Sequence, residues 1–494
     1  MRITGMSSGM DIDSIVKDLM KAHRVPIDRL GQKKQVLEWQ REEYRQMNSK
    51  LVDFRNNKLF NYSLNSSIDT KKATVTGETA ALTAASTKSA VEGSLTIRVN
   101  ELAKSGSVVS NGAGIDPTAS TTATLQNLID NGKMADFSGS ITVNGAPITI
   151  DKATDTINSL LSKINTNAAA KASAFYDTAT GKLSITSKET GKINGTGEVT
   201  LSGALLTSSF NMTNVTLGDD AQLEINGIAT TRSSNIFSIN GVEVTLKAKT
   251  VADPTEIKVS KDVDAIVNTI KSFINDYNDL LSTMSDKVKE ERNRNVLPLT
   301  KEQRDDMKED EVTRWESKAK SGLLRNEALL TKTINDVRAS TNKPVTIGAE
   351  TVTLGMLGIE TGKYFENGKL YLKDENKLRE MLEDNPTKVM SFFTQQSGSV
   401  SSKGLFERMR DDIQISLNAI SSKAGTSAFT SSLTQPFSSE SMIGKDLKQL
   451  TDQMIQKDSK LSDLENNYYK KFNAMEQAMN KYQSQSAYLA NALG

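Results

Sequence analysis

The feature of this sequence that most restricts its fold is a strict seven-residue repeat near the C-terminus. Apolar or aromatic residues occupy every seventh position at Leu447, Met454, Leu461, Tyr468, Met475, Tyr482 and Leu489. A mixed second series follows three residues after each and includes Leu464 but also Lys457 and Lys471. No Pro or Gly interrupts residues 446–493, so the repeat predicts one long helix with a coiled-coil seam. The alternative is a long amphipathic helix that lies on a globular core.

The N-terminus carries a shorter version of this pattern. Helical spacing relates Ile12, Ile15, Val16 and Leu19, and Asp11 and Asp13 are placed to cap the first turn. Pro26 is expected to break or kink the helix. After it, seven-residue steps relate Leu30, Leu37, Tyr44 and Leu51.

Two helical ends with apolar seams have to bury those seams. The simplest partners are each other, in an antiparallel coiled coil, and neighbouring copies of the chain are expected to cover whatever remains exposed. The candidate assembly residues are therefore Ile12, Ile15, Leu19, Leu30, Leu37, Tyr44, Leu51, Leu447, Met454, Leu461, Leu464, Tyr468, Met475, Tyr482 and Leu489.

Between the helical ends, from residue 71 to about residue 262, the apolar period changes to two. Three segments share one pattern: ITVNGAPITI at residues 141–150, LEINGIATT at 223–231 and FSINGVEVTL at 237–246. Each contains Asn-Gly, which favours a type I′ turn because both central positions need a positive φ. The pattern predicts three β-hairpins. Alternation at residues 94–99 and 182–187 predicts further strands, and residues 156–165 predict a short helix.

The helical period returns from residue 263. Residues 286–320 are dense in charges of both signs and predict a solvated helix surface or a helical hairpin. An extended segment is expected near residues 344–362, a turn at Asn367-Gly368 and a helix over residues 375–383. Residues 397–402 and 421–441 are rich in Ser, Thr and Gly and are expected to be linkers, and residues 110–124 a loop.

Composition excludes several kinds of chemistry. The 494 residues include no cysteine, which excludes disulfides, thiolate metal sites and cysteine nucleophiles. His23 is the one histidine, so neither a catalytic triad nor an imidazole zinc site is expected. A formal net charge of +1 argues against nucleic-acid binding. No stretch of about 18 apolar residues predicts a membrane span, and the acidic, interrupted N-terminus does not read as a secretory signal. We therefore expect a structural or binding protein, not an enzyme, with no cofactor and no metal.

Several segments, in order along the chain, resemble one protein family. GMSSGMDIDSIVKDLM at residues 5–20, followed by Pro26 and a heptad helix, is similar to the N-terminal signature of the flagellar filament cap proteins, the hook-associated protein 2 (FliD) family. Residues 138–187 resemble the hook IN motif of flagellins and cap proteins. Residues 264–281, 298–330 and 484–494 resemble the C-terminal region of the family. Residues 74–131 add little beyond a β-like composition.

Together with the periodicity, the resemblance implies an α+β, multidomain fold. Residues 1–45 with 440–494 would form the terminal coiled-coil region, and residues 46–70 with 262–439 a helix-containing leg domain. Residues 71–261 would form one or two β-rich plate domains that contain the hairpins.

The resemblance also implies a function. Cap proteins are exported through the flagellar type III apparatus without a cleaved signal peptide and form a ring-like homo-oligomer, of five or six copies, at the distal end of the filament. There they retain exported flagellin and promote its polymerisation. The implied partners are further copies of the chain, flagellin, the hook–filament junction protein and a cytoplasmic export chaperone. The alternative is a surface adhesin or mucin-binding module that uses the exposed β-rich domains.

Overall fold

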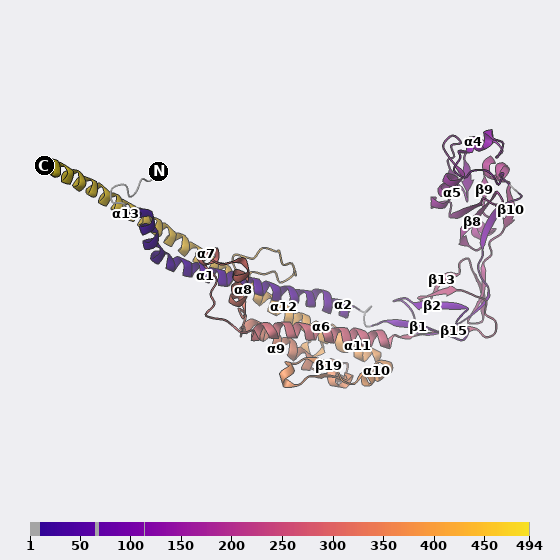
Figure 1. Cartoon of the computed structure of the whole chain (residues 1–494). Helices are drawn as coiled ribbons and strands as arrows, with labels where there is room; N and C mark the ends of the chain where they lie inside the picture. The colour runs from indigo at the N-terminus through magenta and orange to yellow at the C-terminus, as the bar shows by residue number, and fades with distance from the viewer. Residues whose placement is uncertain (1–9, 65–68, 113, 494) are drawn as a thin grey trace. The chain divides into compact units, whose positions relative to one another are not determined.

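The computed structural model describes residues 10–64, 69–112 and 114–493. The chain divides into two compact units, a helical unit of Met1–Ile68 with Val263–Gly494 and a β unit of Asp69–Asp262. The chain thus passes from helices to strands and back to helices, as the change of apolar period predicts (Figure 1). Residues 5–9 of the N-terminal signature lie outside the described residues.

The helical unit is built mainly from long helices. Its helices are α1 (Ile12–Asp53), the π-helical turn η1 (Phe54–Leu59), α2 (Phe60–Ser63), α6 (Val263–Lys289), α7 (Lys301–Asp305), α8 (Glu309–Lys320), α9 (Ala328–Asn342), α10 (Glu375–Asp384), α11 (Pro386–Thr394), α12 (Leu405–Ala424) and α13 (Met442–Leu493). Two short hairpins, β16 (Val345–Ile347) with β17 (Glu350–Val352) and β18 (Ile359–Thr361) with β19 (Leu370–Leu372), complete it.

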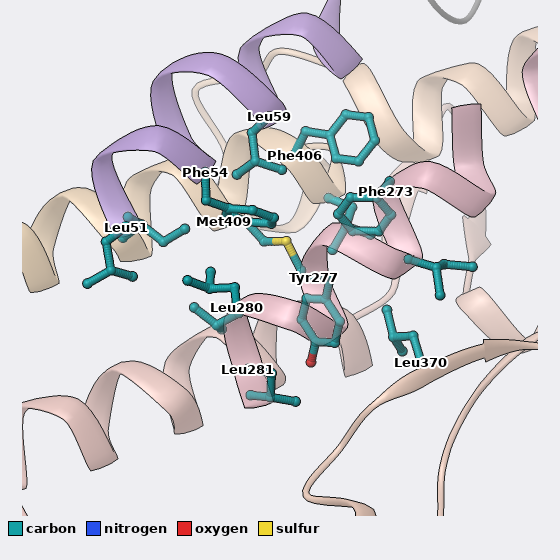
Figure 2. Packing of buried hydrophobic residues seen from close by; sticks show 14 of the residues in the cluster. Leu51, Phe54, Leu59, Phe273, Tyr277, Leu280, Leu281, Leu370, Phe406 and Met409 are labelled. Carbon is teal, nitrogen blue, oxygen red and sulfur yellow. The ribbon is translucent and has the colours of Figure 1, made fainter. Parts of the chain in front are cut away.

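One apolar core joins α1, η1, α6, α9, α10, α11, α12 and the start of α13, and we call this core the hub. Phe273 lies at its centre, and its ring centroid is 4.9 Å from that of Phe406 (Figure 2). The buried hydroxyl of Tyr277 donates a hydrogen bond to the carbonyl of Gly368 at 3.1 Å, and burial raises the pKa of Tyr277 to about 12. The hub therefore holds the C-terminal part of α1 by contacts within one chain.

The β unit consists of antiparallel sheets around two cores. Its strands are β1 (Lys71–Thr76), β2 (Leu82–Ser86), β3 (Gly93–Glu101), β4 (Ser105–Ser110), β5 (Ile141–Val143), β6 (Ala146–Ile148), β7 (Ala172–Asp177), β8 (Lys182–Thr190), β9 (Leu201–Ser202), β10 (Met212–Thr216), β11 (Ala221–Ile225), β12 (Ile228–Arg232), β13 (Ile236–Ile239), β14 (Val242–Leu246) and β15 (Thr255–Lys261). One core lies between the sheets β1-β15-β3-β11-β12 and β13-β14-β2. The other packs α4 (Leu125–Asp130) and α5 (Ile157–Thr166) with β10-β4-β8-β7 and β6-β5-β9.

The structure confirms the three predicted hairpins. They are β5–β6, β11–β12 and β13–β14, each paired antiparallel across an Asn-Gly turn. Both turn residues have positive φ in every case; at Asn144-Gly145 the values are 51° and 78°. The predicted strands at residues 94–99 and 182–187 are β3 and β8, and the predicted helix at residues 156–165 is α5, which Thr156 caps.

Glycines allow strand β4 and two loops of the β unit to touch backbone to backbone. A Cβ on Gly106 would lie 2.2 Å from the carbonyl oxygen of Gly197, and one on Gly218 would lie 2.5 Å from that of Gly191. The Gly218 N–H also donates to the Gly197 carbonyl at 2.8 Å. Any larger residue at these positions would push the loops between the two cores apart.

The structure decides between the two alternatives for Pro26. Pro26 does not break the first helix, since it lies inside α1, and Figure 1 shows that the dark N-terminal part of α1 is bent. Proline removes one backbone hydrogen bond, which a long and otherwise well-packed helix tolerates as a kink. One expectation needs correction: residues 421–441 are not a free linker, because residues 421–424 end α12 and the rest lies along α1.

Candidate assembly interface

The terminal helices α1 and α13 pair in opposite directions within one chain (Figure 1). Near the start of α1, Asp13 accepts a hydrogen bond from the Tyr469 hydroxyl at 2.9 Å. Further along, the ring centroids of His23 and Tyr468 are 6.4 Å apart, and Gly31 lies against the methyl group of Met454. Residue numbers rise on one helix as they fall on the other, which is the predicted antiparallel pairing.

The fifteen candidate residues fall into three groups by exposure. Ile12, Tyr44, Leu51 and Leu447 are buried; Ile15, Leu30, Leu37, Met454, Leu461, Leu464 and Tyr468 are half-buried; Leu19, Met475, Tyr482 and Leu489 are exposed. Tyr44, Leu51 and Leu447 belong to the hub core, so they pack against their own chain and are not available to a second copy. The heptad spacing identified an apolar face on each helix but not the element that covers it.

The last part of α13 extends beyond the start of α1. Because Tyr469 already lies beside Asp13, the residues after about 472 have no counterpart on α1 among the described residues. Met475 is 38% exposed, Tyr482 70% and Leu489 57%. These side chains lie at seven-residue steps and so form an apolar stripe on one face of the helix.

A groove of about 870 Å³ lies between α1 and α13. Its apolar lining comes from Val36, Leu37, Leu450 and Leu297, and Leu297 belongs to the loop that follows α6. That loop is attached to α1 through a hydrogen bond from the Gln32 side chain to the carbonyl of Pro298, at 2.7 Å. The half-buried seam residues are thus partly covered from the side, by a segment that the heptad pattern does not include.

Residues 425–441 also cover part of α1. The Arg45 guanidinium donates to the carbonyls of Leu433 at 2.8 Å and Gln435 at 3.1 Å. Its carbon Cζ lies 3.6 Å from the centre of the Phe437 ring, and that of Arg41 lies 4.2 Å from it. Such stacking of arginine on an aromatic ring is favourable. The sequence did not predict this contact, because Phe429 and Phe437 are almost the only features that distinguish the segment from a linker.

A half-buried ion pair lies where α1, α9 and α12 meet. Lys423 donates to the Glu327 carboxylate at 2.8 Å, and its ammonium nitrogen lies 5.5 Å from the centre of the Tyr44 ring. Burial by itself would raise the pKa of Glu327, but the hydrogen bond from Lys423, together with the nearby Tyr44 hydroxyl, outweighs it and lowers that pKa. Burial raises the pKa of Tyr44, so this hydroxyl stays neutral at physiological pH.

The residues considered for other chemistry have structural roles. The Asp11 carboxylate accepts from the Ser14 N–H at 3.0 Å, which is the predicted cap of α1. Across residues 10–64, 69–112 and 114–493, no three or more His, Asp or Glu side chains are grouped to hold a metal ion. Over the same residues, no helix has the length and apolarity needed to cross a membrane.

Comparison with known proteins identifies the family. The family model described as "Flagellar hook-associated protein 2 C-terminus" matches residues 218–484, and the corresponding N-terminus model matches residues 8–106. The chain belongs to the flagellar hook-associated protein 2 family. Residues 138–187, which resemble the hook IN motif, lie outside both matched ranges, so that assignment stays a prediction.

Relatives in other bacteria match over long stretches. The flagellar hook-associated protein 2 of Halalkalibacterium halodurans is 28% identical over 543 aligned residues, which cover 99% of each chain. That of Thermotoga maritima is 29% identical over 389 residues, covering 76% of this chain and 58% of the relative. The crystal structure of the D1-D2-D3 domains of the flagellar cap protein FliD from Escherichia coli covers 82% of this chain and 99% of its own, with a TM-score of 0.52 and 20% identity. This likeness confirms the α+β, multidomain fold.

Proposed function

We propose that this chain is the structural cap at the distal end of the bacterial flagellar filament, where it retains exported flagellin and promotes its polymerisation. The observation that carries the proposal is the match to a hook-associated protein 2 over 99% of both chains. The relatives reported above carry cap or hook-associated names, and the adhesin alternative has no such support. The role is structural, and we assign no catalytic one.

The proposal includes assembly of several copies into a ring. Its structural support is the exposed apolar stripe of α13, because a single helix cannot bury such a stripe by itself. Neighbouring copies would cover Met475, Tyr482 and Leu489, and would add to the half-buried seam of Leu30, Leu37, Met454 and Leu461. The number of copies, five or six, rests on the family resemblance.

The proposed partners and location follow from the same family. They are flagellin, the hook–filament junction protein below the cap, and a cytoplasmic chaperone that holds the chain before export. Export would use the flagellar type III apparatus without a cleaved signal peptide. The absence of cysteine suits a chain that travels unfolded and refolds outside, where a wrong disulfide would trap it.

Deletion of the gene tests the cap function. We expect flagellin monomers in the growth medium and few or stubby filaments, both reversed when the gene is restored. Filaments of normal length with reduced attachment to surfaces would overturn the cap function and favour an adhesin.

A second experiment tests the stripe on α13. Met475, Met479, Tyr482 and Leu489 are replaced by Gln, and the matched control replaces the exposed Gln477, Asn480, Gln485 and Asn491 by Ala. We expect the first variant to lose assembled species in light scattering while the control keeps them. Equal assembly by both variants would contradict the role of the stripe.

A further inference from the structure

Two arginines and two phenylalanines of the helical unit, Arg55, Phe60, Arg410 and Phe429, form what we call the Arg55 surface. The Arg55 side chain donates to the Asn56 amide oxygen at 2.6 Å, and the Asn56 amide donates to the Phe429 carbonyl at 3.1 Å. The Arg410 guanidinium lies 5.9 Å from the centre of the Phe60 ring. Phe60 is 46% exposed and Phe429 72%. Exposed aromatic rings beside arginine are the composition of strong protein–protein contact sites.

The positive charge of this surface is only partly balanced. Among the described residues, neither Arg55 nor Arg410 has an ion pair, and the covered Nε atom of each has no hydrogen-bond partner. Burial and the neighbouring Arg410 lower the pKa of Arg55, and Asp411 offsets part of this. Asp411 is itself paired with Lys403 at 2.5 Å. A carboxylate brought in from outside would relieve the repulsion between the two guanidinium groups.

The same unit carries a surface of opposite charge around α7 and α8. Five of the seven residues from 305 to 311 are acidic, namely Asp305, Asp306, Glu309, Asp310 and Glu311, and we call them the acidic run. All five are exposed, and among the described residues none of them has an ion pair. Glu309, Asp310 and Glu311 stabilise the N-terminus of α8 through the helix dipole. Asp305 and Asp306 lie at the C-terminal end of α7, where the dipole disfavours them.

The two surfaces of one copy contact α1 at different positions along the helix. The segment that carries the acidic run contacts α1 through Pro298 at Gln32 and through Lys320, whose ammonium lies 4.8 Å from the centre of the Trp39 ring. Arg55 follows Trp39 by 16 residues, which is about 24 Å along a helix. The acidic run and the Arg55 surface of one copy therefore lie at separate positions along α1.

We propose that the Arg55 surface of one copy binds the acidic run of the next copy in the assembly. The inference rests on the proposed ring and adds the contact that joins its members. A ring of identical chains needs two different, complementary surfaces on each copy, and the helical unit has one basic, aromatic surface and one acidic surface. Because the contact joins opposite charges, raising the salt concentration weakens it.

Charge reversal tests the contact in the full chain. One variant carries Arg55→Glu with Arg410→Glu, and a second carries Asp305→Arg with Asp306→Arg. The matched control, Arg325→Glu with Lys343→Glu, makes the same change of net charge as the first variant at exposed sites away from both surfaces. Sedimentation velocity over a range of concentrations reports the size of the assembly. We expect each surface variant to associate about 100-fold more weakly than the wild type and the control.

Mixing the two variants gives the decisive measurement. Each variant alone weakens every contact, because the first places like charges there and the second cancels the net negative charge of residues 305–311. In a ring of six, alternating copies of the two restore the wild-type pairing at every second contact and place opposite charges at positions 305 and 306 of the others; in a ring of five, one contact stays unmatched. We expect the mixture to assemble where each variant alone does not. That rescue also shows that neither variant has lost its fold.

Two results would overturn the proposal. One is assembly of either surface variant at wild-type strength, which would leave the Arg55 surface to a different partner such as flagellin. Alternatively, the mixture stays unassembled although both variants keep the wild-type circular dichroism. Neither result touches the cap function, which the gene deletion tests separately by filament length.

Discussion

The β unit and the C-terminal end of α13 differ in whether their apolar side chains are buried. In the β unit, residues such as Leu183 and Ile185 are fully buried by strands and helices of the same chain. On α13, Met475, Tyr482 and Leu489 are also apolar or aromatic and regularly spaced, yet they are exposed. The first pattern is typical of a core that is complete within one chain, and the second of a surface that binds another molecule. A subunit of an assembly needs both, since a rigid part carries the shape and an open part forms the contacts.

The hub should show the largest effect of a single substitution. Phe273→Ala removes a fully buried ring that packs against Phe393 and Phe406, and we expect it to lower the free energy of unfolding of the helical unit by about 3–5 kcal/mol. Denaturant unfolding measures the loss, and hydrogen exchange localises it. Phe365→Ala, at a residue 73% exposed, is the control and should change stability by less than about 0.5 kcal/mol. Equal losses for both would contradict the assignment of the hub.

The next effect concerns the close backbone contact in the β unit. Gly106→Ala places a Cβ 2.2 Å from the Gly197 carbonyl, and Gly106 does not have a positive φ, so the cost is steric. We expect a loss of about 2 kcal/mol, measured by thermal unfolding and by faster hydrogen exchange in β3 and β8. Gly398→Ala, at an open position of the other unit, should leave stability unchanged. If Gly106→Ala also left stability unchanged, the backbone contact between Gly106 and Gly197 would be less close than the structure shows.

Acid should weaken the β unit partly through Asp155. Burial by itself would raise the pKa of this carboxyl, but hydrogen bonds from Lys163, the Asp151 N–H and Ser159 outweigh it and lower the pKa. Because the folded-state pKa lies below the unfolded value of about 4, the carboxylate stabilises the fold above that pH. The stabilisation is lost as the pH falls through the folded-state pKa.

Asp155→Asn removes this pH dependence. We expect a loss of about 2 kcal/mol at pH 7 that disappears in acid, measured as unfolding free energies between pH 7 and pH 2. Asp253→Asn, at an exposed residue, is the control. A constant difference between Asp155→Asn and the wild type across this range would mean that the charge of Asp155 does not stabilise the fold.

The smallest effect on a single copy should be at the free end of α13. Tyr482→Ala removes an exposed side chain, so we expect the free energy of unfolding of the dissociated chain to change by less than about 0.5 kcal/mol. At concentrations where copies assemble, the same variant should assemble less. A clear loss of stability in the dissociated chain would show that Tyr482 packs within one copy, and the contrast with the β unit would no longer hold.

Local patterns in the sequence predicted much of the fold. The Asn-Gly pairs predicted three hairpins because the turn geometry depends on the two residues themselves, and Asp11 predicted the cap of α1 for the same reason. The heptads predicted that α1 and α13 are long helices with apolar faces. The switch from a period near 3.5 to a period of 2 placed the β-rich region, whose observed unit is Asp69–Asp262.

Contacts between residues far apart in the chain were decided by the tertiary structure alone. Tyr44, Leu51 and Leu447 continue the heptads, yet the hub covers them, because a heptad specifies a face and not the element that packs on it. The segment along α1 depends on Arg41 and Arg45 meeting Phe437, almost 400 residues later. The Arg55 surface likewise combines residues of η1, α12 and the following segment. Periodicity shows which side chains have to be buried, and the packing of distant elements determines which residues cover them.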